Sequence, residues 1–259
     1  MKNKKIILAS MLACNVLWAE SDILKVFDGV STPVGMAFNH NNELIVAEWS
    51  ASRVSVFGKD GRKRMLSDQI KSPSGIAVDK DDNVYVASYS TDTLYKIEPN
   101  GNLSIIADEL ATPAGVSIDK NGNIMVASKA SNAIILIDKK GTKRKLFKDL
   151  QTPVGIVALE HGYAISNING DVSLYDKEKR KTGSFNGFKS PAVGIVGSQE
   201  GNVYAVDYGG NDVVEIQKNG NARVLASSLS SPVGVAINPQ GELFIGTWGD
   251  SAIYKLTIK

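Results

Sequence analysis

Cysteine and histidine are nearly absent from this sequence of 259 residues. Cys14 is the single cysteine, and His40 and His161 are the only histidines. One cysteine forms no internal disulfide, so the fold must be stabilised by packing alone. A single cysteine also excludes a metal site built from several cysteines, and two histidines leave little material for histidine-based catalysis.

Long apolar runs are equally scarce, and the one that stands out, Ile6 to Leu17, lies near the N-terminus. Three lysines precede this run, and Ala19 follows it before Glu20. A basic start, an apolar stretch and a small residue are typical of a cleaved signal peptide. We therefore expect residues 1–19 to be removed and the mature protein to be periplasmic or secreted.

An alternative interpretation makes Cys14 the lipid-modified cysteine of a lipoprotein. The three preceding residues, Met11 to Ala13, fit the usual lipobox poorly, and the apolar run continues past the cysteine to Trp18. A cleaved leader is therefore favoured. No other run reaches the roughly 18 apolar residues that a membrane span requires, so we expect no transmembrane span.

The mature chain also lacks an excess of charge, because it keeps 26 basic and 27 acidic residues once the leader is removed. Surfaces that bind nucleic acid are strongly basic. We therefore expect no nucleic-acid partner.

Proline is rare but regularly placed, since six of the eight prolines follow a serine or threonine at intervals of 40, 40, 40, 38 and 41 residues. A glycine follows each of them, two residues later except in the fifth repeat, where it is three residues later. A period near 40 residues indicates an internal repeat. The six prolines are Pro33, Pro73, Pro113, Pro153, Pro191 and Pro232.

Each repeat has four short apolar runs separated by turns rich in Asp, Asn and Gly. Four antiparallel strands every 40 residues are typical of a propeller blade, and no helical period is present. The sequence thus predicts an all-β, six-bladed β-propeller as a single domain over residues 20–259. In repeat two the predicted strands are Gly75 to Val78, Val84 to Ala87, Leu94 to Ile97 and Leu103 to Ala107.

The last repeat is one strand short, because the chain ends at Lys259 after only three apolar runs. A surplus strand, Ile23 to Phe27, precedes the first repeat. An open ring would expose a strand edge, so we expect Ile23 to Phe27 to complete the last blade.

The Pro and Gly residues have a structural interpretation. Proline fixes its own φ and is expected to hold the preceding Ser or Thr in an extended conformation as the chain enters the innermost strand. Glycine allows close backbone approach around the narrow axis.

The segment Gly115 to Ser128 resembles the NHL repeat, as does the corresponding part of repeat two. The resemblance extends over nearly all of the mature chain, although repeat four replaces the usual turn with Glu160 to Tyr163. Similar propellers include gluconolactonase-like hydrolases, streptogramin lyase and extracellular sensor domains. Fold alone does not choose among these functions.

The loops between the second and third strands vary where the framework repeats, and they share one face, called here the top face. Variable loops on a constant frame carry function in many proteins. Four aromatic residues fall on adjacent blades and favour a surface that binds a protein, peptide or glycan. The candidate ligand-binding residues are Trp49, Tyr89, Tyr208 and Trp248, with Lys129 and Asn167 on the remaining arc.

Two carboxylates, Glu48 and Asp207, begin these loops, with Asn167, Asp171 and Asn211 close by in register. Oxygen ligands of this kind suit Ca²⁺ or Mg²⁺. The resemblance to gluconolactonase-like proteins implies a divalent metal held by Glu, Asp and Asn at the channel mouth. That family's Glu-Gly-Pro opening is absent here, and the residues after the repeat prolines are mostly Val and Ala.

Three functions remain open from the sequence. We favour a monomeric binding scaffold or sensor that uses the top face. A metal-dependent lactonase is the main alternative, and it requires Glu48 and Asp207 to converge. A structural protein of the cell envelope, held by basic segments on the outer strands, has only charge to support it. Both histidines are expected in turns on the opposite face, and no Gly-x-Ser-x-Gly segment occurs.

Overall fold

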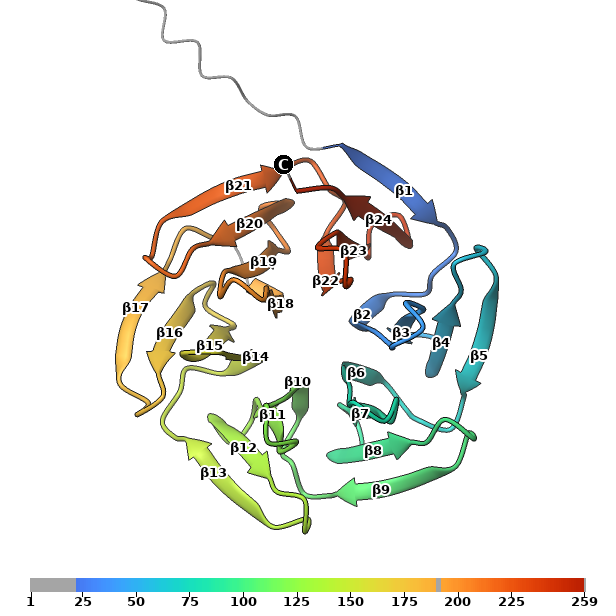
Figure 1. Ribbon diagram of the computed structural model, residues 1–259, viewed down its shortest axis with the longest axis horizontal. Helices are drawn as coiled ribbons and strands as arrows, with labels where there is room; N and C mark the ends of the chain where they lie inside the picture. The colour runs from blue at the N-terminus through green and yellow to red at the C-terminus, as the bar shows by residue number, and fades with distance from the viewer. Residues whose placement is uncertain (1–21, 190–191, 259) are drawn as a thin grey trace, which may run out of the picture.

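The computed structural model describes residues 22–189 and 192–258, which form six four-stranded antiparallel sheets around a central axis (Figure 1). Each sheet is one blade, and its strands run in sequence from the axis to the outside, except in blade six, where the first described strand lies outermost. The predicted all-β, six-bladed propeller is confirmed. Within the described residues no helix is long and apolar enough to cross a membrane. The predicted leader and Cys14 lie outside them.

The first three blades have closely similar strand lengths. Blade one consists of β2 (Pro33–Phe38), β3 (Leu44–Glu48), β4 (Arg53–Phe57) and β5 (Lys63–Ser67). Blade two consists of β6 (Pro73–Val78), β7 (Val84–Ser88), β8 (Thr93–Ile97) and β9 (Leu103–Ala107). Blade three consists of β10 (Pro113–Ile118), β11 (Ile124–Ser128), β12 (Ala133–Ile137) and β13 (Lys143–Phe147).

The last three blades include one longer hairpin and the strand that closes the ring. Blade four consists of β14 (Pro153–Leu159), β15 (Gly162–Asn167), β16 (Val172–Asp176) and β17 (Lys181–Phe185). Blade five consists of β18 (Ala192–Gly197), β19 (Val203–Asp207), β20 (Asp212–Ile216) and β21 (Ala222–Ala226). Blade six consists of β22 (Pro232–Ile237), β23 (Leu243–Thr247), β24 (Ala252–Leu256) and β1 (Ile23–Phe27).

The first turn of most blades is held by an Asp or Asn side chain that bonds to its own loop. In blade two, Asp79 Oδ1 accepts hydrogen bonds from the backbone N–H groups of Asp81 and Asn83, both at 2.9 Å. Asn83 Nδ2 donates to the other oxygen of Asp79, and Asp82 adopts a left-handed φ of 59°. This explains why Asp and Asn recur in these turns.

Blade four departs from this turn, as its sequence indicates. Only Glu160 and His161 separate β14 from β15, and the two strands pair from Leu159↔Gly162 onward. Five residues separate the first two strands in blades one, two and three. The shorter turn lengthens both strands of the blade-four hairpin.

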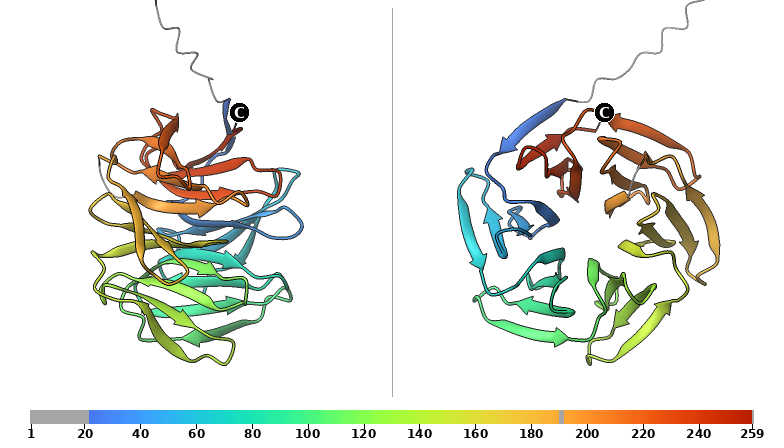
Figure 2. Two further views of the ribbon diagram at one scale, coloured as in Figure 1. Left: turned by 60° about the vertical axis from the view of Figure 1, so that its left-hand side comes forward. Right: turned by 180° about the vertical axis from the view of Figure 1, so that it is seen from behind.

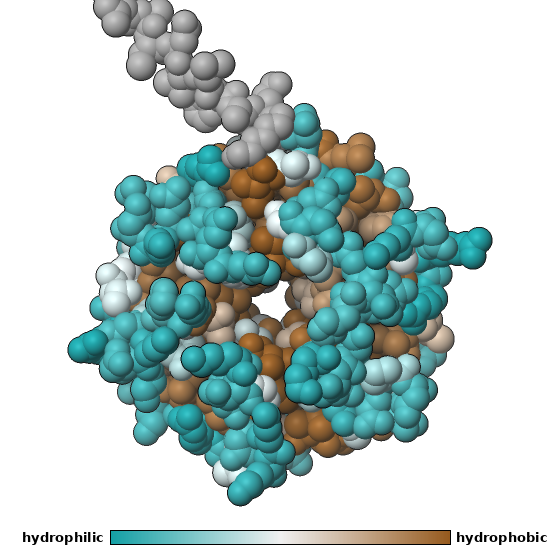
Figure 3. All heavy atoms as spheres, in the orientation of Figure 1, coloured by the Kyte–Doolittle hydropathy of each residue, from teal (hydrophilic) through white to brown (hydrophobic). Residues whose placement is uncertain are grey.

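The core of the propeller lies between neighbouring blades. Ile45 and Val54 of blade one pack in one cluster with Ile76 and Val86 of blade two, and all four are almost fully buried. Five further clusters fill the remaining boundaries between blades. The space-filling view accordingly shows hydrophobic side chains between more polar loops, and the axis is open at the centre (Figure 3).

Ring closure follows the prediction, since β1 pairs with β24 on the outside of blade six. Ile23 lies opposite Leu256, and the Phe27 ring stands 4.6 Å from that of Phe57 in blade one. The first and last described strands therefore lie side by side, as both face views show (Figures 1 and 2).

The expected extended conformation before the repeat prolines is wrong at the five prolines whose preceding residue the structure describes. Thr32, Ser72, Thr112, Thr152 and Ser231 all have left-handed φ values between 43° and 61°. The chain has to turn sharply from the outside of one blade to the axis of the next, and the left-handed residue makes that turn. Its carbonyl is then used as a hydrogen-bond acceptor by the top loops described below.

The expected close approach of the glycines is present. A Cβ added to Gly75 would overlap the carbonyl oxygen of Ala114 on the innermost strand of the next blade. The same overlap with the next blade's backbone would occur at Gly35 and Gly194. Glycine at these positions lets the six innermost strands come together around the axis.

Candidate binding site on the top face

Six residues at equivalent positions surround the top mouth of the axis, and we call them the rim residues. Each directly follows the second strand of its blade, and five donate a backbone hydrogen bond to the carbonyl before a repeat proline, such as Trp49 N to Thr32 O at 3.2 Å. The left-handed turns thus position the rim. The rim residues are Trp49, Tyr89, Lys129, Ile168, Tyr208 and Trp248.

In blade four the rim position belongs to Ile168, because the structure shifts the expected register by one residue. Asn167 pairs with Pro153, as Glu48 pairs with Pro33 in blade one. The Asn167 side chain is 4% exposed, and its Nδ2 donates to Asp171 Oδ1 at 2.8 Å. The interval from Pro153 to Asn167 is one residue shorter than that from Pro33 to Glu48, and this missing residue is the sequence signal for the change.

The four aromatic rim residues form two contact pairs. The rings of Trp49 and Tyr89 are 4.8 Å apart, and those of Tyr208 and Trp248 are 5.8 Å apart in an edge-to-face arrangement. Trp248 Nε1 donates to Pro33 O at 3.0 Å, which ties blade six to blade one. The four predicted aromatic positions therefore lie along one continuous arc.

Lys129 extends this arc to blade three. Its Nζ donates to Tyr89 Oη at 3.0 Å and lies 5.5 Å from the centre of the Tyr89 ring. The ammonium group is thus held at the mouth of the axis.

Below the rim lies a cavity of about 440 Å³. Its walls come from the innermost strands, and they are apolar at nearly every position. The one hydroxyl among the wall residues, Ser74 Oγ, points to backbone, since it donates to Pro113 O at 2.9 Å. The wall side chains are Val34, Met36, Ser74, Ile76, Ala114, Val116, Val154, Ile156, Ile195, Val233 and Val235.

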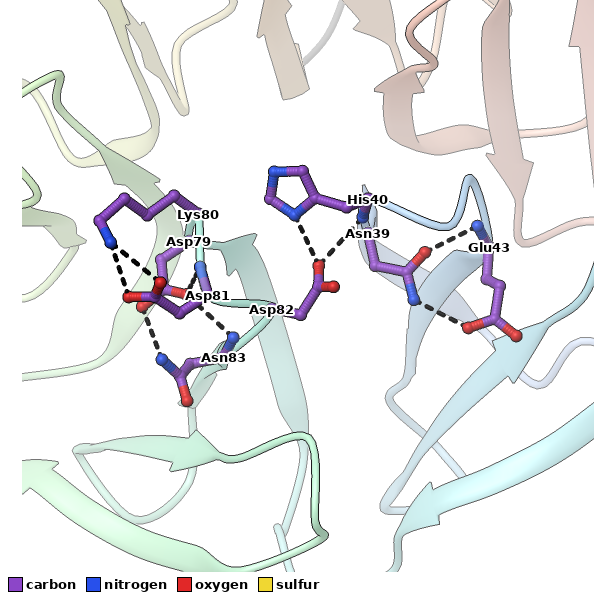
Figure 4. Close-up of polar contacts among 8 residues, drawn as sticks. All are labelled: Asn39, His40, Glu43, Asp79, Lys80, Asp81, Asp82 and Asn83. Atoms are coloured by element: carbon purple, nitrogen blue, oxygen red, sulfur yellow. Dashed lines mark hydrogen bonds and ion pairs between the residues drawn. The ribbon is translucent and has the colours of Figure 1, made fainter.

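The mouth on the opposite face differs in character. A wider cavity of about 900 Å³ is lined there by turn residues such as Asn39, Lys80 and Gln199. His40 Nδ1 lies 2.8 Å from Asp82 Oδ1, between the turns of blades one and two (Figure 4). Both histidines are in turns at the end of the strands away from the rim, so they do not reach the top cavity.

Glu48 is fully buried, and its carboxylate accepts hydrogen bonds from several neighbouring groups. Arg53 Nη2, Lys63 Nζ and the backbone N–H of Ser31 each donate to its Oε2 at 2.9 Å. Ser55 Oγ and Arg53 Nε donate to Oε1. Burial raises the pKa of Glu48, but these hydrogen bonds outweigh it and lower the pKa to about 2. The residue ties β3 to β4, to β5 and to the loop before Pro33.

Asp207 has a related place in blade five. Its side chain is 2% exposed, Oδ2 accepts the backbone N–H of Lys189 at 2.7 Å, and Oδ1 accepts that of Gly210 at 3.0 Å. Like Glu48, it holds the loop two residues before the repeat proline. Neither carboxylate lines the top cavity. Over residues 22–189 and 192–258, no group of three or more His, Cys, Asp or Glu residues is placed to hold a metal ion.

Six radial, four-stranded antiparallel blades around one axis define the class of this protein as a six-bladed β-propeller. A family model described as a beta-propeller repeat matches residues 66–96. Human NHL-repeat-containing protein 4 is 36% identical over 98 residues, covering 36% of this chain and 79% of that protein. The chain belongs to the NHL-repeat proteins.

Solved structures share the whole ring. A gluconolactonase from Xanthomonas campestris matches with a TM-score of 0.81 and 14% identity, covering 93% of this chain and 91% of that one. Virginiamycin B lyase from Staphylococcus aureus matches at 0.70 and 14%, covering 92% and 99%. An auxiliary nutrient binding protein from Bacteroides thetaiotaomicron matches at 0.71 and 13%, covering 88% and 69%. At such identities the likeness shows the fold alone.

Proposed function

We propose that the protein is a non-catalytic binding scaffold or sensor whose top face takes part of a protein, peptide or glycan into the axial cavity. The observation that carries this proposal is the continuous aromatic arc above an apolar cavity. Aromatic side chains around a concave, apolar site are typical of ligand pockets. The leader predicted from residues 1–19 supports binding in the periplasm or outside the cell.

The contacts of the two candidate metal ligands support the scaffold over a metal-dependent lactonase. Glu48 is neutralised by Arg53 and Lys63, and Asp207 accepts backbone N–H groups. A lactonase would need both carboxylates to face a shared ion at the mouth. Their present hydrogen bonds instead secure two loops of the top face, in blades one and five.

An array of synthetic peptides and glycans, probed with labelled protein, tests the proposal. We expect the wild type to bind a subset of the array and the double variant Trp49→Ala, Trp248→Ala to lose that subset, because the substitutions remove both indole rings from the arc. Each ring contributes a large contact area at the mouth.

The control is His161→Ala, which alters an exposed turn on the opposite face. Its binding profile and its thermal unfolding are expected to match the wild type. If the double variant is folded and keeps the wild-type profile, the binding surface lies elsewhere and the proposal is wrong.

A further inference from the structure

We infer that the group received by the top cavity is a carboxylate attached to a flat apolar body, with Lys129 as the residue that binds the charge. This inference rests on the proposed function and specifies its ligand. Three properties of the cavity indicate this ligand: its walls are apolar, it offers few hydrogen-bonding groups, and one positive charge lies at its mouth.

The walls favour an apolar body. Wall side chains from the innermost strands are aliphatic except for Ser74, whose Oγ already donates to backbone carbonyls. The indole N–H of Trp248 donates to Pro33 O. A sugar entering this cavity would lose hydrogen bonds to water and find few partners, at a cost for each unpaired hydroxyl.

The charge at the mouth favours an anion. Among residues 22–189 and 192–258, Lys129 is the only charged residue that lines the cavity. An ammonium group has three N–H donors, and the one acceptor that the described residues supply to it is Tyr89 Oη. Within the described part of the chain no Asp or Glu forms an ion pair with Lys129. A ligand carboxylate would supply the missing opposite charge next to low-dielectric walls, where the attraction is stronger than in water.

The geometry fits one ligand with two different ends. Blade three lies opposite blade six, so Lys129 and Trp248 line the mouth from opposite sides of the axis. A cavity of about 440 Å³ lies in the range of roughly 300–1,000 Å³ that small-molecule pockets occupy. A bicyclic aromatic carboxylate can therefore reach the ammonium group while its ring system contacts the aromatic arc.

Tryptophan fluorescence gives a direct measurement, because Trp49 and Trp248 are the only tryptophans from Glu20 onward and both are rim residues. The mature protein is titrated with 2-naphthoate and with its neutral isostere 2-naphthamide. We expect the carboxylate to bind about tenfold more tightly or better, as a hydrogen bond to a charged group predicts.

Lys129→Met tests the assigned residue. The variant is expected to bind 2-naphthoate no better than 2-naphthamide while its affinity for the amide stays at the wild-type value. Lys129→Arg is expected to keep the preference for the carboxylate. Lys120→Met, in an exposed turn of the same blade on the opposite face, is the matched control and is expected to behave as the wild type.

The ligand carboxylate can come from a free acid or from the C-terminus of a peptide. A second titration, followed by calorimetry, compares N-acetylphenylalanine with its amide. Preference for the free carboxylate here as well extends the ligand class to peptide ends, whereas preference limited to the naphthoate pair supports small aromatic acids.

Two outcomes would overturn the inference. Equal affinity for naphthoate and naphthamide, or a preference that survives Lys129→Met, removes the role of the charge. If the amide still binds in a manner that depends on Trp49 and Trp248, the binding scaffold stands and only the anion is wrong. If the binding of both naphthyl compounds and of every array ligand is independent of Trp49 and Trp248, the proposed function itself fails.

Discussion

Glu48 shows how one residue can secure a functional loop without taking part in binding. Its carboxylate accepts hydrogen bonds from β4, from β5 and from the loop at Ser31 that leads into the axis. Trp49 is the next residue along the chain. The buried charge therefore fixes the backbone from which a rim indole projects.

The lowered pKa of Glu48 makes part of the folding free energy depend on pH. The pKa falls from an ordinary 4.5 to about 2, so the carboxylate stabilises the fold fully above about pH 4.5 and progressively less as the pH falls toward 2. A shift of this size corresponds to about 3 kcal/mol. Glu48→Gln is expected to lower the free energy of unfolding by about that amount at pH 7.

Urea denaturation at several pH values measures this effect. The difference between wild type and Glu48→Gln is expected to be largest near neutrality and to shrink between pH 4.5 and pH 2. Glu109→Gln, at an exposed loop position, serves as the control and is expected to unfold as the wild type does. A constant difference across the whole pH range would contradict the assigned ionisation.

Gly75 illustrates a residue whose missing side chain matters. Because a Cβ there would overlap Ala114 O on the next innermost strand, Gly75→Ala is expected to cost about 2 kcal/mol or more through displaced backbone. Gly183 in β17 has open space where a Cβ would lie and no left-handed φ. Gly183→Ala is therefore expected to leave stability nearly unchanged. Thermal unfolding of the two variants compares them, and equal melting temperatures would refute the explanation.

Among the strands, β1 has a particular role in stability because its pairing with β24 joins the two ends of the described chain and closes the ring. Phe27 in this strand packs on Phe57 of blade one and belongs to the cluster between blades six and one. Phe27→Ala is expected to destabilise the protein by about 2–3 kcal/mol, below the roughly 3–5 kcal/mol of a fully buried Phe. Ile23→Ala, at an exposed position of the same strand, is expected to change stability little. A denaturation midpoint as low for Ile23→Ala as for Phe27→Ala would argue against the packing of the Phe27 side chain as the cause.

The strands were predictable because their pattern repeats six times. The sequence predicts Ile23 to Phe27 as the closing strand, and β1 has the same bounds. The turn at the preceding Ser or Thr was mispredicted, because local proline sterics favour an extended residue whereas the path between blades requires a left-handed one. The one-residue shift at Ile168 depends on strand pairing that the six-fold comparison did not resolve in the irregular repeat.

At the scale of the whole molecule, the ring gathers residues that are far apart in the sequence. The repeat register and the predicted ring closure already place Trp49 and Trp248 on adjacent blades, and the structure adds the hydrogen bond from Trp248 Nε1 to Pro33 O that joins blade six to blade one. The depth of the cavity and its aliphatic walls depend on how closely the innermost strands approach. Such features arise only from the closed ring, so the sequence predicts the kind of side chain at the mouth better than the volume beneath it.

The adjacency of the chain ends has a mechanical consequence. Thr257 N donates to Asp22 O at 3.3 Å, and the first residue pair of the closing ladder is Ile23 with Leu256. Because β1 and β24 run antiparallel, a force pulling these two ends apart acts on that pair first and on the next pair only after it breaks. Tension on these two ends therefore breaks the pairing of β1 with β24 one residue pair at a time, rather than shearing all the pairs at once. The blades support one another against unfolding. Tension on the ends would nevertheless open the ring at blade six, where β1 would detach first and the other strands would follow in turn.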